Sequence, residues 1–189
     1  MIEPGTYLKS CHPDQPDCSD RDQSIRINEP VVQQFKLEID PTNFSDWTAL
    51  HRLLIDSFAY MEERIDPPSS LTRMSAATLQ EKSGEENLML IWSDDELVAC
   101  GFLKELPDAI YLGKLAVRED MRGRGLLRRM ISTAEEIAKA RDKPALELQA
   151  RIELTENHAT FGALGFLQTG TTAHAGYDRP TSITMRKAL

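Results

Sequence analysis

At 189 residues the chain has the size of one domain, because domains most often contain about 100 to 150 residues and cores split only beyond about 250. Hydrophobic residues make up 41% and charged residues 28%, proportions that exclude a disordered, collagen-like or disulfide-dense chain. The formal net charge of -8 gives no overall positive field, so general nucleic-acid binding is not expected.

The remaining composition argues against a membrane protein and against a metal site. No run approaches the roughly 18 to 20 uninterrupted apolar residues that span a bilayer, and the N-terminal residues lack the apolar core of a signal peptide. We therefore expect a cytoplasmic protein without a membrane partner. The three cysteines, Cys11, Cys18 and Cys100, fit neither a disulfide framework nor a common metal spacing, and no metal is expected. Cys100 lies in an apolar run and is expected to be buried.

Two regions are expected along the chain. Residues 1–33 predict a flexible N-terminal arm, since they include four of the ten prolines and show no sustained periodicity. Residues 34–189 predict the folded domain. In chain order its patterns indicate a strand at 35–39, helices at 47–61 and 75–82, strands at 88–92, 97–106 and 109–117, a helix at 125–141, a strand at 145–150, a helix at 155–164, and strands at 167–174 and 182–187.

The expected fold class follows from the three strands between 88 and 117. Short turn sequences separate them, which predicts an antiparallel meander. The second and third of these strands are apolar almost throughout, as expected for strands that helices cover on both faces. The pattern therefore predicts helices and strands combined on one sheet.

The most informative segment joins the third meander strand to the next helix. Five of the twelve residues from Arg118 to Arg129 are arginines. Arg124, Arg128 and Arg129 lie in or beside the first helical turn, where the helix dipole disfavours cations by about 0.3 to 1 kcal/mol each. The helix starts on glycines, without a side chain that could cap its first amides. A bound anion would accept hydrogen bonds from these amides and neutralise the arginines.

Three other interpretations of this segment compete with an anion-binding site. On spacing alone, a turn at Gly123 and Gly125 flanked by solvated arginines explains it equally well. The Walker pattern is absent, because no Gly-Lys-Ser/Thr follows. A dinucleotide-binding Rossmann site is a weak alternative, since its fingerprint requires glycine where Arg128 stands and Asp142 falls at the end of the helix.

The same segment resembles a known family, the GNAT-type N-acyltransferases that use acetyl-CoA. Their signature R/Q-x-x-G-x-G/A is matched by Arg122 and Gly125, while Leu127 replaces the final small residue. Two further landmarks look similar and occur in the expected order: Leu115-Ala116-Val117 before the signature, and Asn157 and Ala159 ahead of Leu164-Gly165-Phe166 after it.

This resemblance implies both the fold and the cofactor. The fold would be α+β in three layers: a mixed, mostly antiparallel sheet of about seven strands, flanked by helices and splayed between two central strands. Acetyl-CoA would bind in the V-shaped opening, with its pantetheine arm along the third meander strand and its pyrophosphate on amides of the glycine turn. The implied cofactor-binding residues are Leu115, Ala116, Val117, Arg122, Gly123, Arg124, Gly125, Leu126, Leu127, Arg128, Asn157 and Phe161.

The implied reaction is acetyl transfer to a primary amine of a small molecule or peptide, by direct attack of the amine on the thioester. In many relatives a tyrosine protonates the departing thiolate, but the matching residue here is Phe161. Relatives often place a glutamate base on the third meander strand, where Lys114 stands here. The catalytic candidates are therefore Tyr177 and His174, in the last hairpin, which the strands at 167–174 and 182–187 form, and Glu147, on the strand at 145–150. Proton transfer through water is the alternative.

The acceptor would enter over the loop at 62–70, which in this family commonly borders the substrate cleft. Glu63 and Asp66 would attract a protonated amine, and Ser69 and Ser70 would offer hydrogen bonds. A solvated loop that merely ends the first helix is the alternative. The resemblance also allows a second copy of this chain as a partner, since homodimers are common in this fold.

Two other functions stay open at this point. The departures at Phe161 and Leu127, and the missing strand glutamate, would suit a non-catalytic acyl-CoA sensor. An enzyme that acetylates aminoacyl-tRNA is disfavoured by the charge of -8 and the 6% aromatic content.

Overall fold

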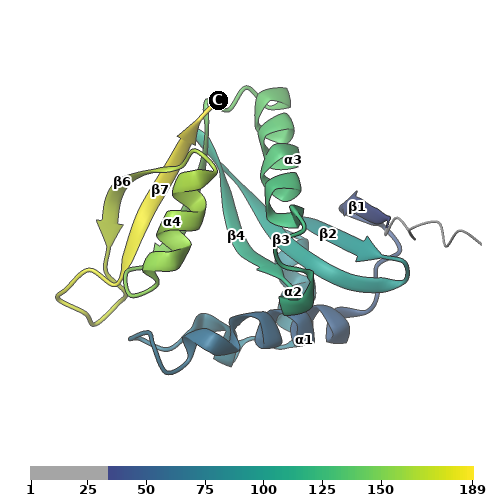
Figure 1. The fold of residues 1–189 in the computed structure, drawn as a ribbon, viewed down its shortest axis with the longest axis horizontal. Coiled ribbons are helices and arrows are strands. Elements are labelled where there is room, and N and C mark those ends of the chain that lie inside the picture. The colour runs from purple at the N-terminus through teal and green to yellow at the C-terminus, as the bar shows by residue number, and fades with distance from the viewer. Residues whose placement is uncertain (1–33) are drawn as a thin grey trace, which may run out of the picture. The chain divides into compact units, whose positions relative to one another are not determined.

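The computed structural model describes residues 34–189, so the predicted arm at 1–33, with Cys11 and Cys18, lies outside the described residues. The described chain forms one seven-stranded sheet in the order β1-β2-β3-β4-β5-β7-β6 (Figure 1). Neighbouring strands are antiparallel except for β4 and β5, which are parallel. The strands are β1 Phe35–Ile39, β2 Asn87–Ser93, β3 Glu96–Leu106, β4 Ala109–Val117, β5 Ala145–Arg151, β6 Leu167–Thr172 and β7 Ser182–Ala188.

Helices cover both faces of the sheet and complete three layers, which confirms the predicted fold class. The helices are α1 Trp47–Phe58, α2 Ala76–Ser83, α3 Leu126–Ala140 and α4 Thr155–Ala163, and short 3-10 turns lie at η1 Ala59–Met61, η2 Ser70–Arg73 and η3 Glu119–Met121. Side chains of α1 and α2 pack with β2 and β3 in one hydrophobic cluster. Side chains of α3 and α4 pack with β3, β4, β5 and β7 in another.

The helices form where apolar residues recur at the helical period. In α1 the stripe Leu50, Leu53 and Leu54 is buried, and the Asp46 carboxylate accepts a hydrogen bond from the first turn. In α2 Ser75 supplies the predicted cap. The predicted first helix at 47–61 differs in one respect, because its last turn tightens into η1 after Phe58.

The central strands separate after a short stretch of pairing. Only Ile110, Tyr111 and Leu112 of β4 have register partners on β5, and the last pair is Leu112 with Leu148. The C-terminal half of β4 and the end of β5 therefore diverge, as the predicted splay requires. Because α3 follows β4 and α4 follows β5, the first turns of both helices lie at this open end.

Two further findings concern single features. Cys100 is buried as predicted, and burial raises the pKa of its thiol far above the ordinary value, so this thiol is an inert core group. Within residues 34–189, none of the helices combines the length and apolar character needed to cross a membrane.

Candidate active site

The first turn of α3 lies open at the splayed end of the sheet. Gly123 and Gly125 have φ values of 76° and 79°, a left-handed conformation that glycine adopts without strain. No described atom lies within 4 Å of a Cβ built at either position. Gly125 is the N-cap of α3, and no side chain caps the helix there. The first amides of α3 therefore keep their hydrogen-bonding capacity for an anion.

Arg118 holds Asp120, which lies just before the glycine turn, and Glu96 at the start of β3. Its guanidinium donates to both carboxylate oxygens of Asp120, at 2.7 and 3.0 Å, and to Glu96 at 2.8 Å. The hydrogen bonds from Arg118 hold the pKa of Asp120 below its ordinary value. Arg129 is also engaged, because its Nη1 donates to the carbonyl of Phe35 at 2.6 Å. The guanidinium groups of Arg118 and Arg129 are thus engaged by groups of the protein itself.

Arg122, the first residue of the signature, attaches the glycine turn to the end of α1. Its Nη2 donates to the Ser57 carbonyl at 3.3 Å, and its Nε donates to the Val117 carbonyl at 3.5 Å. Its guanidinium also lies 5.7 Å from the centre of the Tyr60 ring. Arg122 therefore fixes the position of η1 relative to the end of β4.

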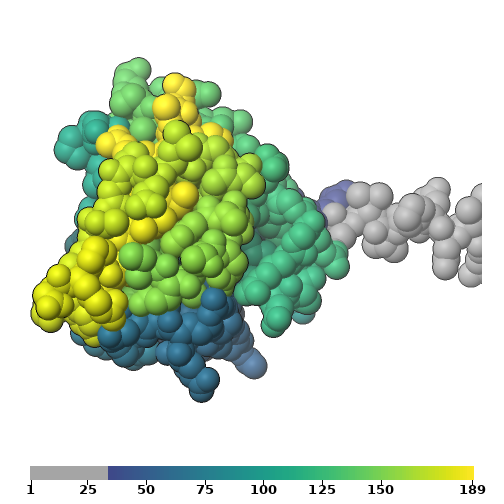
Figure 2. Space-filling model, turned by 60° about the vertical axis from the view of Figure 1, so that its left-hand side comes forward, coloured from purple at the N-terminus to yellow at the C-terminus, as the bar shows by residue number. Residues whose placement is uncertain are grey.

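Tyr60 links this assembly to α4 and was not predicted as a site residue. The Asn157 amide donates to the Tyr60 hydroxyl at 3.1 Å, although the two residues are 97 positions apart. In Figure 2 the lime atoms of α4 adjoin the green atoms of the β4–α3 segment and, below, the blue atoms of the α1–η2 region. No local pattern in the sequence could reveal Tyr60, since its partners come from distant elements.

The side chains of the other predicted cofactor-binding residues differ in how far they are buried. Leu115, Val117 and Leu127 pack against the hydrophobic cluster on the α3 face, whereas Ala116 is buried in the cluster on the α1 face. Leu126 is buried in the α3 cluster, and Arg128 is exposed. Leu127 thus directs part of its bulk into the protein, which explains how leucine is accommodated where relatives have a small residue.

Phe161 is half-buried and packs against the hydrophobic core. Its ring packs edge-on against Phe166, with 5.9 Å between the ring centroids. Both residues contribute to the cluster under α3 and α4. Phe161 therefore serves to attach α4 to the sheet, and its side chain has no group that could donate a proton.

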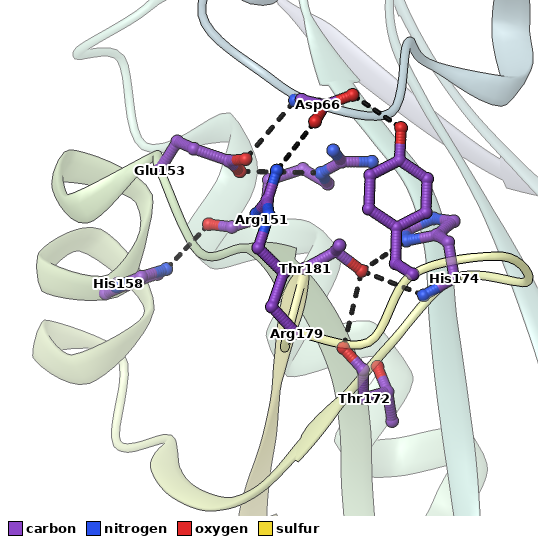
Figure 3. Close-up of polar contacts among 9 residues, drawn as sticks. Asp66, Arg151, Glu153, His158, Thr172, His174, Arg179 and Thr181 are labelled. Atoms are coloured by element: carbon purple, nitrogen blue, oxygen red, sulfur yellow. Dashed lines mark hydrogen bonds and ion pairs between the residues drawn. The ribbon is translucent and has the colours of Figure 1, made fainter.

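The predicted catalytic residues Tyr177 and His174 belong to a polar network between the last hairpin and the α1–α2 loop (Figure 3). The Tyr177 hydroxyl donates to Asp66 Oδ1 at 2.5 Å, and Arg179 donates to Asp66 Oδ2 at 2.7 Å. His174 Nδ1 lies 2.6 Å from the Thr181 hydroxyl. Partial burial, together with the charge of nearby Arg151, lowers the pKa of His174. The Tyr177 amide donates to the His174 carbonyl at 3.0 Å, and this backbone contact links the His174–Thr181 pair to the contacts around Asp66.

A second pair of charges extends the same network to the end of β5. The Asp66 amide donates to Glu153 Oε1 at 3.2 Å, and Arg151 Nε lies 3.6 Å from Glu153 Oε2 (Figure 3). Burial alone would raise the pKa of Glu153, but hydrogen bonds from its own amide and from that of Asp66 lower it overall. The network fixes the loop at 62–70 against β5 and the hairpin.

Glu147 lies apart from this network. It faces Tyr111 in the paired part of β4 and β5, and its Oε2 is 3.7 Å from Arg186 Nε. Among the predicted acceptor residues, Glu63 is exposed and Ser69 caps η2. Ser70 Oγ accepts a hydrogen bond from Lys114 Nζ at 3.0 Å.

The Asp66 contact is expected to be pH-dependent. The Tyr177 hydroxyl, followed by Arg179, lowers the pKa of Asp66, so the contact is complete above the ordinary aspartate pKa of about 3.9 and is lost as the pH falls through the lower, folded value. NMR signals of the Tyr177 ring should titrate with a midpoint below about 3.9. Asp66→Asn should remove this titration. A midpoint at or above the ordinary value would contradict the hydrogen bond.

Comparisons with known proteins agree with this architecture. The family model described as the Acetyltransferase (GNAT) family matches residues 47–166. The PaiA N-acetyltransferase from Thermoplasma acidophilum, solved in complex with coenzyme A, has a TM-score of 0.67 at 16% identity, with 82% of this chain and 99% of that chain covered.

Two further solved structures share the fold. A ribosomal-protein alanine N-acetyltransferase from Escherichia coli has a TM-score of 0.59 at 18% identity, covering 82% of this chain and 94% of its own. A GNAT acetyltransferase from Elizabethkingia anophelis with bound acetyl-CoA has a TM-score of 0.59 at 14% identity, covering 82% and 98%. The sequence matches no curated protein significantly. The family match over most of the folded domain, together with the splayed sheet and the glycine turn before α3, shows that the chain belongs to the GNAT acetyltransferase family.

Proposed function

We propose that this protein transfers the acetyl group of acetyl-CoA to a primary amine of a small molecule or peptide, by direct attack of the amine on the thioester. The observation that carries the proposal is the open, uncapped first turn of α3 beside the splay of β4 and β5. Family membership adds the reaction class. The neighbours from Thermoplasma acidophilum and Elizabethkingia anophelis, solved with coenzyme A and acetyl-CoA, add support for the cofactor.

The residues at this end of the sheet fit acetyl-CoA. The exposed glycines at 123 and 125 leave space for a phosphate to approach the backbone, and amides of residues from Arg124 to Arg128 would hold the pyrophosphate. Backbone groups of Leu115 and Val117, which have no register partner on β5, would pair with the pantetheine arm. Asn157 would contact the same arm from the first turn of α4. When bound, acetyl-CoA supplies the electrophilic thioester carbon.

The chain itself must orient the acceptor and provide for proton movement. His174 has a lowered pKa, so its ring is predominantly neutral near neutral pH and can accept a proton from the acceptor through water. Tyr177 has a raised pKa, because its hydroxyl donates to Asp66, and it therefore stays protonated. In this proposal Tyr177 and Asp66 position the hairpin that carries His174, and Glu147 has no assigned step.

Two measurements test the proposal. Acetyl-CoA should raise the melting temperature, because a ligand that binds only the native state stabilises it. A panel of amines should then release free thiol from acetyl-CoA. Absence of any thermal shift at millimolar acetyl-CoA would refute the cofactor assignment. A shift without thiol release from any amine would instead indicate the non-catalytic acyl-CoA sensor.

Asn157→Ala should weaken acetyl-CoA binding about 5- to 30-fold, since loss of one or two neutral hydrogen bonds costs about 1 to 2 kcal/mol. Thr160→Ala is the matched control, because Thr160 lies on the exposed side of the same helix and its hydroxyl bonds only to the Glu156 carbonyl among the described contacts. Calorimetric titration should show an unchanged dissociation constant for this control. Equal constants for the two variants would contradict the role of Asn157.

A further inference from the structure

Lys114 occupies the place where β4 leaves β5. The last register pair between these strands is Leu112 with Leu148, and the register between β3 and β4 shifts between Cys100 and Phe102 at the same level. Lys114 has a φ of 53°, a conformation that side-chain-bearing residues rarely adopt. Such strained residues concentrate at binding and catalytic sites, where the surrounding structure enforces them.

The Lys114 side chain extends to the loop that borders the proposed acceptor cleft. Its Nζ donates to Ser70 Oγ at 3.0 Å, and Ser70 is an exposed residue at the start of η2. Lys114 itself is half-buried. The ammonium group therefore lies between the opening of the sheet and the α1–α2 loop.

The Lys114 ammonium forms no ion pair with an acidic residue among the described residues. Its one described polar contact is the neutral Ser70 hydroxyl. The positive charge of Lys82 also repels the Lys114 ammonium, although Lys82 is already paired with Glu86. Together Lys114, Lys82 and Glu86 carry a net charge of +1. Burial, followed by the charge of Lys82, lowers the pKa of Lys114, whereas Glu86 acts in the opposite direction.

Asp66, one of the two acidic residues expected to attract an amine, is already compensated. Both carboxylate oxygens of Asp66 accept hydrogen bonds from the last hairpin, one of them from the Arg179 guanidinium. Asp66 therefore contributes a positioning contact rather than a free negative charge. Since a partly buried charge without a partner is unfavourable, the ammonium of Lys114 is suited to receive an anion from outside the protein.

We propose that the acceptor is an amine that carries a carboxylate close to its amino group, as an amino acid does, and that Lys114 and Ser70 bind this carboxylate. This inference rests on the proposed function. A carboxylate would balance the unpaired charge and accept charge-assisted hydrogen bonds from the Lys114 ammonium and the Ser70 hydroxyl. Binding it there would hold the amino group near the splay, where the thioester would be.

The test compares each of the common amino acids with its carboxamide in the thiol-release assay. For the best substrates, kcat/KM should be about 10- to 100-fold higher for the acid than for the amide, as expected for one charge-assisted contact. Lys114→Gln should reduce this preference to within about threefold while the acetyl-CoA-dependent thermal shift stays unchanged. Lys104→Gln, at an exposed position of β3, removes the same charge and should keep the preference.

Failures of the inference and of the proposed function give different results. Thiol release without a preference for the acid, or a preference that Lys114→Gln leaves intact, would overturn the inference but not the acetyltransferase activity. If no amine releases thiol, calorimetry with the coenzyme A complex decides, because amino acids should still bind more tightly than their amides. Equal binding of acids and amides would overturn the inference. Ser70→Ala, which leaves the Lys114 charge in place, should reduce the preference only partly.

Discussion

Gly125→Glu should weaken acetyl-CoA binding by about 100-fold or more and remove the thermal shift caused by the cofactor. A glutamate at this N-cap would place its bulk and negative charge where the amides of α3 would meet the pyrophosphate. Loss of two charge-assisted hydrogen bonds, at about 1.5 to 3 kcal/mol each, accounts for an effect of this size. The fold should survive, because no described atom lies within 4 Å of the new Cβ. A negative charge at a helix N-terminus also offsets part of the backbone strain.

The matched control for this variant is Gly176→Glu. Gly176 has a φ of 84° and no described atom within 4 Å of an added Cβ, so the substitution introduces the same strain and charge in the last hairpin. Calorimetric titration with acetyl-CoA should give a nearly unchanged dissociation constant for this control. Wild-type affinity in a folded Gly125→Glu protein would refute the placement of the pyrophosphate.

Phe166→Ala should give the largest loss of stability. Phe166 is 1% exposed and packs against Phe161 between α4 and the sheet. No residue of α4 itself is fully buried, so the helix depends on flanking residues such as Leu154 and Phe166 for its attachment. Removing a buried phenyl ring lowers the free energy of unfolding by about 3 to 5 kcal/mol. For a domain of this size the melting temperature should fall by roughly 6 to 20 °C.

Leu167→Ala is the control beside it in the chain. Leu167 is 73% exposed, so its truncation should change the free energy of unfolding by less than about 0.5 kcal/mol. Calorimetric melting of both variants makes the comparison. Similar melting temperatures would show that Phe166 does not anchor α4.

Local patterns in the sequence were enough to predict the elements and their order. The stripe at Leu50, Leu53 and Leu54 defines a helix face, and the apolar strands between short turns define the meander. The glycines at 123 and 125 mark the turn before α3, because only a residue without a side chain adopts that backbone easily. These features depend on residues a few positions apart, so a single sequence is enough to predict them.

The partners of the polar side chains were decided by the tertiary structure alone. Asp66 looked like a free acid in the sequence, yet its partners Tyr177 and Arg179 are more than 100 positions away. Tyr60 gained its role only when the end of α1 met Asn157 on α4. Lys114 donates to the Ser70 hydroxyl, 44 positions away, and forms no ion pair among the described residues. Such contacts arise where distant elements pack together, and no local periodicity records which side chains will then be compensated and which will be left for a ligand.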